Sequence, residues 1–205
     1  MNQNNNSFFT QLNFQIMKQI MLPLLLLLAF ATSGQAQVDV QINPVAILFS
    51  SIDLTAEFGV SPDFGVEAGL DYNFQNWDID DIDYKNNSVG IRAIGKYYFS
   101  PEDGIDRWAI GGYTRFVTGT ASTEEETSNE REEVKNTKFA IGFYTGYKWV
   151  SKKNVVFELG LGLGRNFVRK YEYSDGEEVN TDDIPLLNID VLARLSIGYR
   201  FGGSK

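Results

Sequence analysis

The stretch Leu187–Phe201, LNIDVLARLSIGYRF, alternates between apolar and polar residues. Successive side chains of a β-strand point to opposite faces, so a period of two indicates an extended strand. The polar face of this strand includes Asp190, Arg194 and Arg200. The apolar face carries Leu187, Ile189, Val191, Ala193, Leu195, Ile197, Tyr199 and Phe201. This strand is long compared with the usual length of about 5–6 residues, and we interpret it as one strand of a transmembrane β-barrel, apolar outside and polar inside.

Seven further segments of the chain show a similar alternation, and together with the last one they predict eight strands. They are residues 38–48, 52–60, 66–74, 88–99, 108–119, 138–150 and 155–168. The connections alternate between short turns (61–64, 100–107, 151–154) and long polar segments (75–87, 120–137, 169–185). Outer-membrane barrels are built in this way, with short periplasmic turns and longer extracellular loops. We therefore predict an all-β fold, an eight-stranded antiparallel up-and-down transmembrane β-barrel preceded by a signal peptide.

The amino-terminal region has the features of a signal peptide. Lys18, its one charged residue, precedes an apolar run at residues 20–31, and the small residue Ala36 offers a cleavage site. That run is shorter than the roughly 20 residues that a membrane-spanning helix requires. The prediction is a signal peptide over residues 1–36, with translation starting at Met1 or Met17, and a barrel domain over residues 37–205.

The composition of the chain excludes several classes of protein. It contains no cysteine, which excludes disulfides and thiolate metal sites, and no histidine, the commonest general base and metal ligand. The formal net charge is −9, whereas nucleic-acid binding calls for basic patches. Acyl-ester hydrolysis and acyl transfer usually depend on histidine. We therefore expect no enzymatic activity, no cofactor and no nucleic-acid partner.

The aromatic residues distinguish a membrane barrel from a soluble one. Most of them share the apolar face of their strand and lie near a strand end. Two rims are predicted, one of Phe99, Trp108, Trp149 and Phe201, the other of Phe74, Phe116, Phe139 and Phe167. Two aromatic girdles that flank an aliphatic band are typical of membrane barrels. A lipocalin-like soluble barrel would instead line its cavity with apolar groups.

The polar faces of the strands carry charges of both signs, which would meet inside the barrel. An eight-stranded barrel is just wide enough for side chains to fill it, and an unpaired buried charge is too costly to persist. We predict a plugged lumen with an ion-pair network of Glu57, Glu67, Arg92, Lys96, Arg115, Lys148, Glu158, Asp190 and Arg194. Gly160, Gly162 and Gly164 share this inner face, which predicts a glycine stripe on a crowded wall.

The end of the last strand carries the most specific motif. Tyr199-Arg200-Phe201 resembles the aromatic carboxy-terminal signal that the barrel assembly machinery reads, although four residues follow Phe201. With this motif the chain is similar to the OmpA/OmpX-like small eight-stranded outer-membrane barrels of Gram-negative bacteria. The resemblance implies an outer-membrane location, with lipid, lipopolysaccharide and the barrel assembly machinery as partners. It implies no single activity.

The long polar segments are acidic, which raises the question of metal binding. Oxygen-rich loops can bind calcium, and the weak candidates here are Asp78, Asp80, Asp81 and Asp83. They lack the order and the glycine of an EF-hand, so a solvated acidic loop is the favoured interpretation. Divalent cations shared with lipopolysaccharide or with an extracellular partner remain a hypothesis for these loops.

Three functions are compatible with the sequence. The leading hypothesis is an integral outer-membrane barrel with a structural or surface-interaction role and acidic extracellular loops. The second is a conduit or carrier for a small hydrophobic solute across the outer membrane, which would need a lateral opening or a gap in the charge network. The third is a soluble periplasmic ligand-binding barrel.

Overall fold

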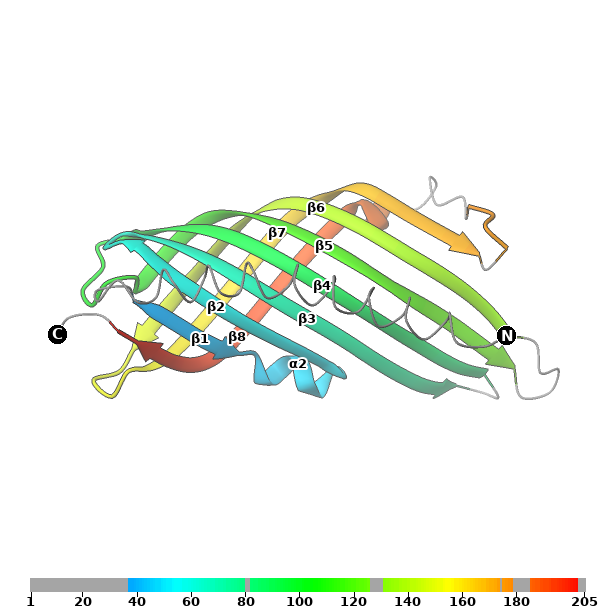
Figure 1. Cartoon of the computed structure of the whole chain (residues 1–205), viewed down its shortest axis with the longest axis horizontal. Coiled ribbons are helices and arrows are strands. Elements are labelled where there is room, and N and C mark those ends of the chain that lie inside the picture. Colours follow the sequence, from blue (N-terminus) through cyan, green and yellow to red (C-terminus); the bar gives the residue numbers. More distant parts are fainter. Residues whose placement is uncertain (1–36, 80–81, 126–130, 174, 179–184, 203–205) are drawn as a thin grey trace, which may run out of the picture.

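The structure is a closed barrel of eight antiparallel strands (Figure 1). It is a computed structural model that describes residues 37–79, 82–125, 131–173, 175–178 and 185–202. Each strand pairs with its neighbours in sequence, and the last strand returns to the first. The strands are β1 (Val38–Ile42), β2 (Ser51–Ser61), β3 (Phe64–Ile79), β4 (Ile82–Phe99), β5 (Arg107–Glu125), β6 (Arg131–Val150), β7 (Val155–Tyr173) and β8 (Ile189–Phe201). The prediction of an eight-stranded up-and-down barrel is confirmed; the predicted signal peptide lies outside the described residues.

The first strand is much shorter than predicted. Residues 38–48 were expected to form one strand, but β1 ends at Ile42 and is followed by the short helix α2 (Pro44–Leu48). Pro44 has no N–H for a strand ladder but is suited to the first turn of a helix. Asn43 caps that helix, because its side chain accepts a hydrogen bond from the N–H of Val45. Among the described residues, no helix is long and apolar enough to cross a membrane.

Residues 75–87 and 120–137 were expected to be acidic loops, but their described residues form strand; residues 80–81 and 126–130 lie outside the described chain. Strands β3 and β4 pair out to Ile79 and Ile82, and β5 pairs with β6 out to Glu124 and Arg131. In β5 and β6 the extensions are polar on both faces, and the alternation that marks one-sided burial fades there. In β3 and β4 the alternation continues, through Trp77 and Ile79 and then Ile82 and Tyr84, but the many acidic residues favoured the interpretation as a loop. The two hairpins therefore project beyond the start of β8, at the right of Figure 1. The third long segment, 169–185, also begins as strand, since β7 runs to Tyr173, and η1 (Pro185–Asn188) then leads into β8.

The two faces of the barrel wall have opposite chemistry. Outward leucines such as Leu161 and Leu163 are 49% and 57% exposed. Inward charged residues such as Glu57, Glu67 and Lys96 are 0% exposed. This distribution is the inverse of that in soluble proteins, where lysine and glutamate are almost never fully buried unless paired.

The short first strand leaves a seam in the wall. The last register pair between β1 and β8 joins Ile42 to Ile197. Toward its amino-terminal end, over residues 189–196, β8 pairs with β7 alone within the described chain. Helix α2 takes the position beside β8 and β2 that a longer β1 would occupy, as Figure 1 shows.

Candidate functional site in the barrel interior

Lys96 connects three carboxylates inside the barrel. It projects inward from β4, and its Nζ donates to Glu57 of β2 at 2.9 Å, Glu67 of β3 at 2.6 Å and Glu158 of β7 at 2.6 Å. All four side chains are buried. Charge-assisted hydrogen bonds of this length are among the stronger ones in proteins. Because these four strands surround the lumen, this cluster ties together separate parts of the wall.

A second set of ion pairs lies on one side of this cluster. The Nζ of Lys148 donates to Glu57 at 2.6 Å and to Asp39 at 2.9 Å. The guanidinium of Arg200 contacts both oxygens of Asp39, at 2.7 and 2.8 Å. Tyr98 donates its hydroxyl to the other oxygen of Glu57 at 2.5 Å. These contacts join β1 and β8, the two strands that close the ring, to β2, β4 and β6.

Arg194 spans the interior behind the seam. Its Nη1 lies 2.5 and 2.6 Å from the two oxygens of Glu67, and its Nη2 donates to the hydroxyl of Thr55 at 2.7 Å. Its Nε donates to Ser196 at 2.8 Å. Arg194 stands on the part of β8 that lacks β1 as a partner, so side chains link β8 to β2 and β3 where the backbone ladder does not.

A third set of ion pairs is less deeply enclosed. Arg92 contacts Asp53 at 2.7 Å and Asp71 at 3.5 Å. Arg115 contacts Asp71 at 3.1 Å and Asp190 at 3.3 Å. The side chain of Arg115 is 19% exposed, which makes it the most accessible cation of the interior ion pairs described here. These pairs join β2, β3, β4, β5 and β8.

Tyrosine rings and glycines complete the inner wall. Tyr144 donates its hydroxyl to Glu158 at 2.6 Å, and Tyr113 donates to Asp190 at 2.7 Å. A Cβ atom added at Gly160 would collide with the Tyr144 hydroxyl. The glycine stripe on β7 therefore faces inward and makes room for the inward rings of Tyr113 and Tyr144.

The structure places all nine residues of the predicted lumen network inside the barrel and links them through one chain of ion pairs. These are Glu57, Glu67, Arg92, Lys96, Arg115, Lys148, Glu158, Asp190 and Arg194. The candidate set omitted further members of the network: Asp39, Asp53, Asp71 and Arg200, with the hydroxyls of Tyr98, Tyr113 and Tyr144. All of these residues lie on the polar side of the alternating pattern of their strands, which is the sequence feature that indicates an inward position.

The same cluster raises the question of metal binding. Carboxylate oxygens of Glu57, Glu67 and Glu158 lie within 4.8 Å of one another, close enough to hold a metal ion. The ammonium of Lys96 already lies within 2.9 Å of all three. The lysine thus supplies the positive charge that these carboxylates need, and their arrangement fits a structural ion-pair cluster.

The weak metal candidates in the first long segment are not placed by the structure. Asp80 and Asp81 lie outside the described residues. Asp78 and Asp83 are described only as backbone positions, which pair across β3 and β4.

The residues of the predicted assembly signal lie on the outer face at the end of β8. Tyr199 and Phe201 are both exposed, and their rings meet edge to face with centroids 5.0 Å apart. Arg200 lies between them in sequence and points inward to Asp39. The motif therefore presents two aromatic rings outward and one charge inward.

The chain resembles known proteins both in its sequence family and in its fold. A family model described as "Protein of unknown function (DUF3575)" matches residues 20–185. No curated protein gives a significant match. Among solved structures, the barrel is similar to a major outer membrane protein from Thermus thermophilus, with a TM-score of 0.53 and 12% sequence identity. The match covers 81% of this chain and 99% of that one, so the two proteins share a fold.

Proposed function

The chain belongs to the DUF3575 family, and we propose that it is an integral outer-membrane β-barrel protein with a closed, charge-filled lumen and a structural or surface-interaction role. The proposed location agrees with the fold it shares with an outer membrane protein. More specific membership in the OmpA/OmpX-like group remains part of the proposal.

The observation that carries the proposal is the inverted distribution of apolar and charged residues. Large apolar side chains such as Leu159, Leu161 and Leu195 cover the outside, while Lys96 and Glu67 are fully buried. In water, such an outer surface would expose far more contiguous apolar area than a soluble monomer tolerates. In a bilayer the same surface contacts acyl chains, and the closed ladder satisfies the backbone polar groups.

Aromatic pairs at one end of the barrel support the same proposal. Tyr97 and Phe99 precede one short turn, and Tyr147 and Trp149 precede another. Trp108, at the start of β5, packs against Tyr147 with ring centroids 5.9 Å apart. Together with Tyr199 and Phe201 they make an outward aromatic rim at the end where the short turns lie. Such belts sit at the level of the lipid headgroups in membrane proteins.

The interior favours a closed barrel over a conduit. Ion pairs cross the lumen from wall to wall, as those of Lys96 and Arg194 do. We propose a non-catalytic role, since the buried carboxylates are occupied in pairing with cations. The proposed partners are outer-membrane lipid, lipopolysaccharide and the barrel assembly machinery, which would read Tyr199 and Phe201. The projecting β3–β4 and β5–β6 hairpins are the surfaces proposed to meet an extracellular partner.

Heat-modifiable migration tests the proposal. Outer-membrane material that contains the protein is run on an SDS gel with and without boiling. A closed barrel migrates faster unboiled than boiled. Recovery of the protein in the aqueous periplasmic extract, with no shift on boiling, would contradict the proposal and favour the soluble ligand-binding barrel.

A further inference from the structure

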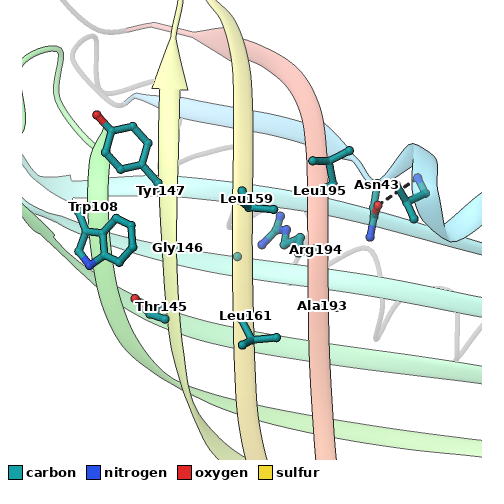
Figure 2. A pocket seen from close by; sticks show the side chains of 12 residues that line it. Asn43, Trp108, Thr145, Gly146, Tyr147, Leu159, Leu161, Ala193, Arg194 and Leu195 are labelled. Carbon is teal, nitrogen blue, oxygen red and sulfur yellow. Dashed lines mark hydrogen bonds between the residues drawn. The ribbon is translucent and has the colours of Figure 1, made fainter.

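An apolar groove crosses the outer wall of the barrel from β5 to helix α2. It has a volume of about 470 Å³. Its outward lining comprises Trp108, Thr145, Tyr147, Leu159, Leu161, Ala193 and Leu195, and at one end Asn43 and Val45. Figure 2 shows these side chains on neighbouring strands, with Trp108 and Tyr147 at one end and Asn43 at the other.

The groove arises from a change of side-chain size between two adjacent rows. One row consists of Tyr147, Leu159 and Leu195, which oppose each other across β6, β7 and β8. In the next row Leu161 lies between two smaller residues, Thr145 and Ala193. Residues that oppose each other on one face of a sheet lie about 4.5–5.5 Å apart, so small side chains beside large ones lower the surface locally.

The seam forms one end of this groove. Because β1 ends at Ile42, the neighbour of β8 at this level is helix α2 rather than a strand. Val45 of α2 lines the groove. The following residues, Ile47, Leu48 and Phe49, are 52%, 81% and 65% exposed and extend the apolar surface away from the barrel.

The groove provides apolar contact and no accessible charge. Arg194 is among its lining residues, but its side chain is 1% exposed and its guanidinium binds Glu67 in the interior. A charged headgroup would find no counter-ion there among the described residues, whereas a flexible hydrocarbon chain fits a narrow apolar groove. We propose that this groove binds one acyl chain of a membrane lipid, held between the aromatic pair Trp108–Tyr147 and helix α2.

This inference rests on the proposed function, because it requires the outer wall to lie in a bilayer. The test uses the whole mature barrel in vesicles that contain phosphatidylethanolamine. The vesicles are then dissolved, and native mass spectrometry measures the lipid that the protein retains. Ala193→Phe and Thr145→Phe place a ring in the groove. Val191→Phe is the matched control, since Val191 is also outward and exposed on β8 but does not line the groove.

The expected result is one retained phosphatidylethanolamine in the wild type and in Val191→Phe. A retained fraction about tenfold lower is expected in Ala193→Phe and Thr145→Phe, because the added ring takes up the volume that the acyl chain would occupy. Equal retention in all four proteins, or no retained lipid in the wild type, would overturn the inference. So would a wild-type dimer that dissociates in the groove variants, which would show that a second copy of the chain occupies the groove.

The shift of the gel band on boiling, measured on the same samples, distinguishes failure of the groove inference from failure of the proposed membrane location. If the band is present in all four proteins and lipid retention fails, the groove inference alone is wrong. If the wild type shows no such band in vesicles, the proposed membrane location fails and the acyl-chain site fails with it.

Discussion

The Nζ of Lys96 lies 2.6 Å from the carboxylate of Glu158, although the two residues stand on strands that are not neighbours in the ring. Lys96 is on β4 and Glu158 is on β7, so this ion pair crosses the lumen. Both side chains are almost completely buried. The barrel is therefore held from within by side chains as well as by its backbone ladder.

Removing the cation of this pair should destabilise the barrel. Lys96→Met leaves Glu57, Glu67 and Glu158 buried without their shared ammonium. Breaking a buried pair by removing one partner costs about 3–5 kcal/mol, and we expect a loss of that size in the free energy of unfolding. Reversible urea titration of the protein folded in liposomes measures it. Lys152→Met, at an exposed turn position, is the control and should change little; an equal effect of both variants would contradict the structural role of Lys96.

The glycine stripe is expected to be sensitive to added volume. Gly160→Val places a branched side chain where the Tyr144 hydroxyl lies. Overpacking of this kind costs about 1–3 kcal/mol. Leu159→Val, one position away on the outward face, should cost less because lipid can adapt to it. The same urea titration compares them, and a Gly160→Val protein as stable as the wild type would mean that Tyr144 does not fill this space.

A charge on the outer wall should hinder insertion. We expect Leu161→Arg to reduce the free energy of folding into liposomes by about 2–4 kcal/mol if Leu161 lies near the bilayer midplane. Pro62→Arg, at an exposed position in the short turn 61–64, serves as the control and should insert normally. Normal insertion of the Leu161→Arg variant would show that this face does not contact lipid.

The filled lumen should not conduct ions. In planar bilayers the wild type is expected to show no discrete channel openings, because Lys96 and Arg194 cross the lumen to Glu158 and Glu67. The double variant Lys96→Ala, Arg194→Ala removes two of these bridges and is expected to show openings. Discrete openings of the wild type would overturn the closed-barrel proposal and favour the conduit.

Residue alternation predicted most of the fold because one-sided burial leaves a period of two in the sequence. The last strand, with Ile189 to Phe201 facing outward at every second position, is the clearest case. Alternation gives no information where burial is not one-sided, as in the polar extensions of β5 and β6. In β3 and β4 it continues through Trp77, Ile79, Ile82 and Tyr84, but their acidic neighbours favoured a loop. The turn from β1 into α2 depends on the local hydrogen bonds of Asn43, which a periodic pattern does not contain.

For the interior, the sequence indicated which residues face inward but not how they pair. Asp39 was not among the candidates, yet it binds both Lys148 and Arg200. Its partners stand 109 and 161 residues away in sequence. Such pairings follow from barrel closure and strand register, and alternation along one strand does not determine them.

A nitroxide scan along β8 tests directly whether successive residues of the wall contact lipid and the interior in turn. The chain has no native cysteine, so single cysteines at residues 191–197 can each carry a spin label in a reconstituted bilayer. Collision with oxygen, which dissolves in lipid, is expected to be high at Val191, Ala193, Leu195 and Ile197 and low at the positions between them. Uniform collision with a water-soluble nickel complex along the strand, or the opposite phase of alternation, would contradict this expectation.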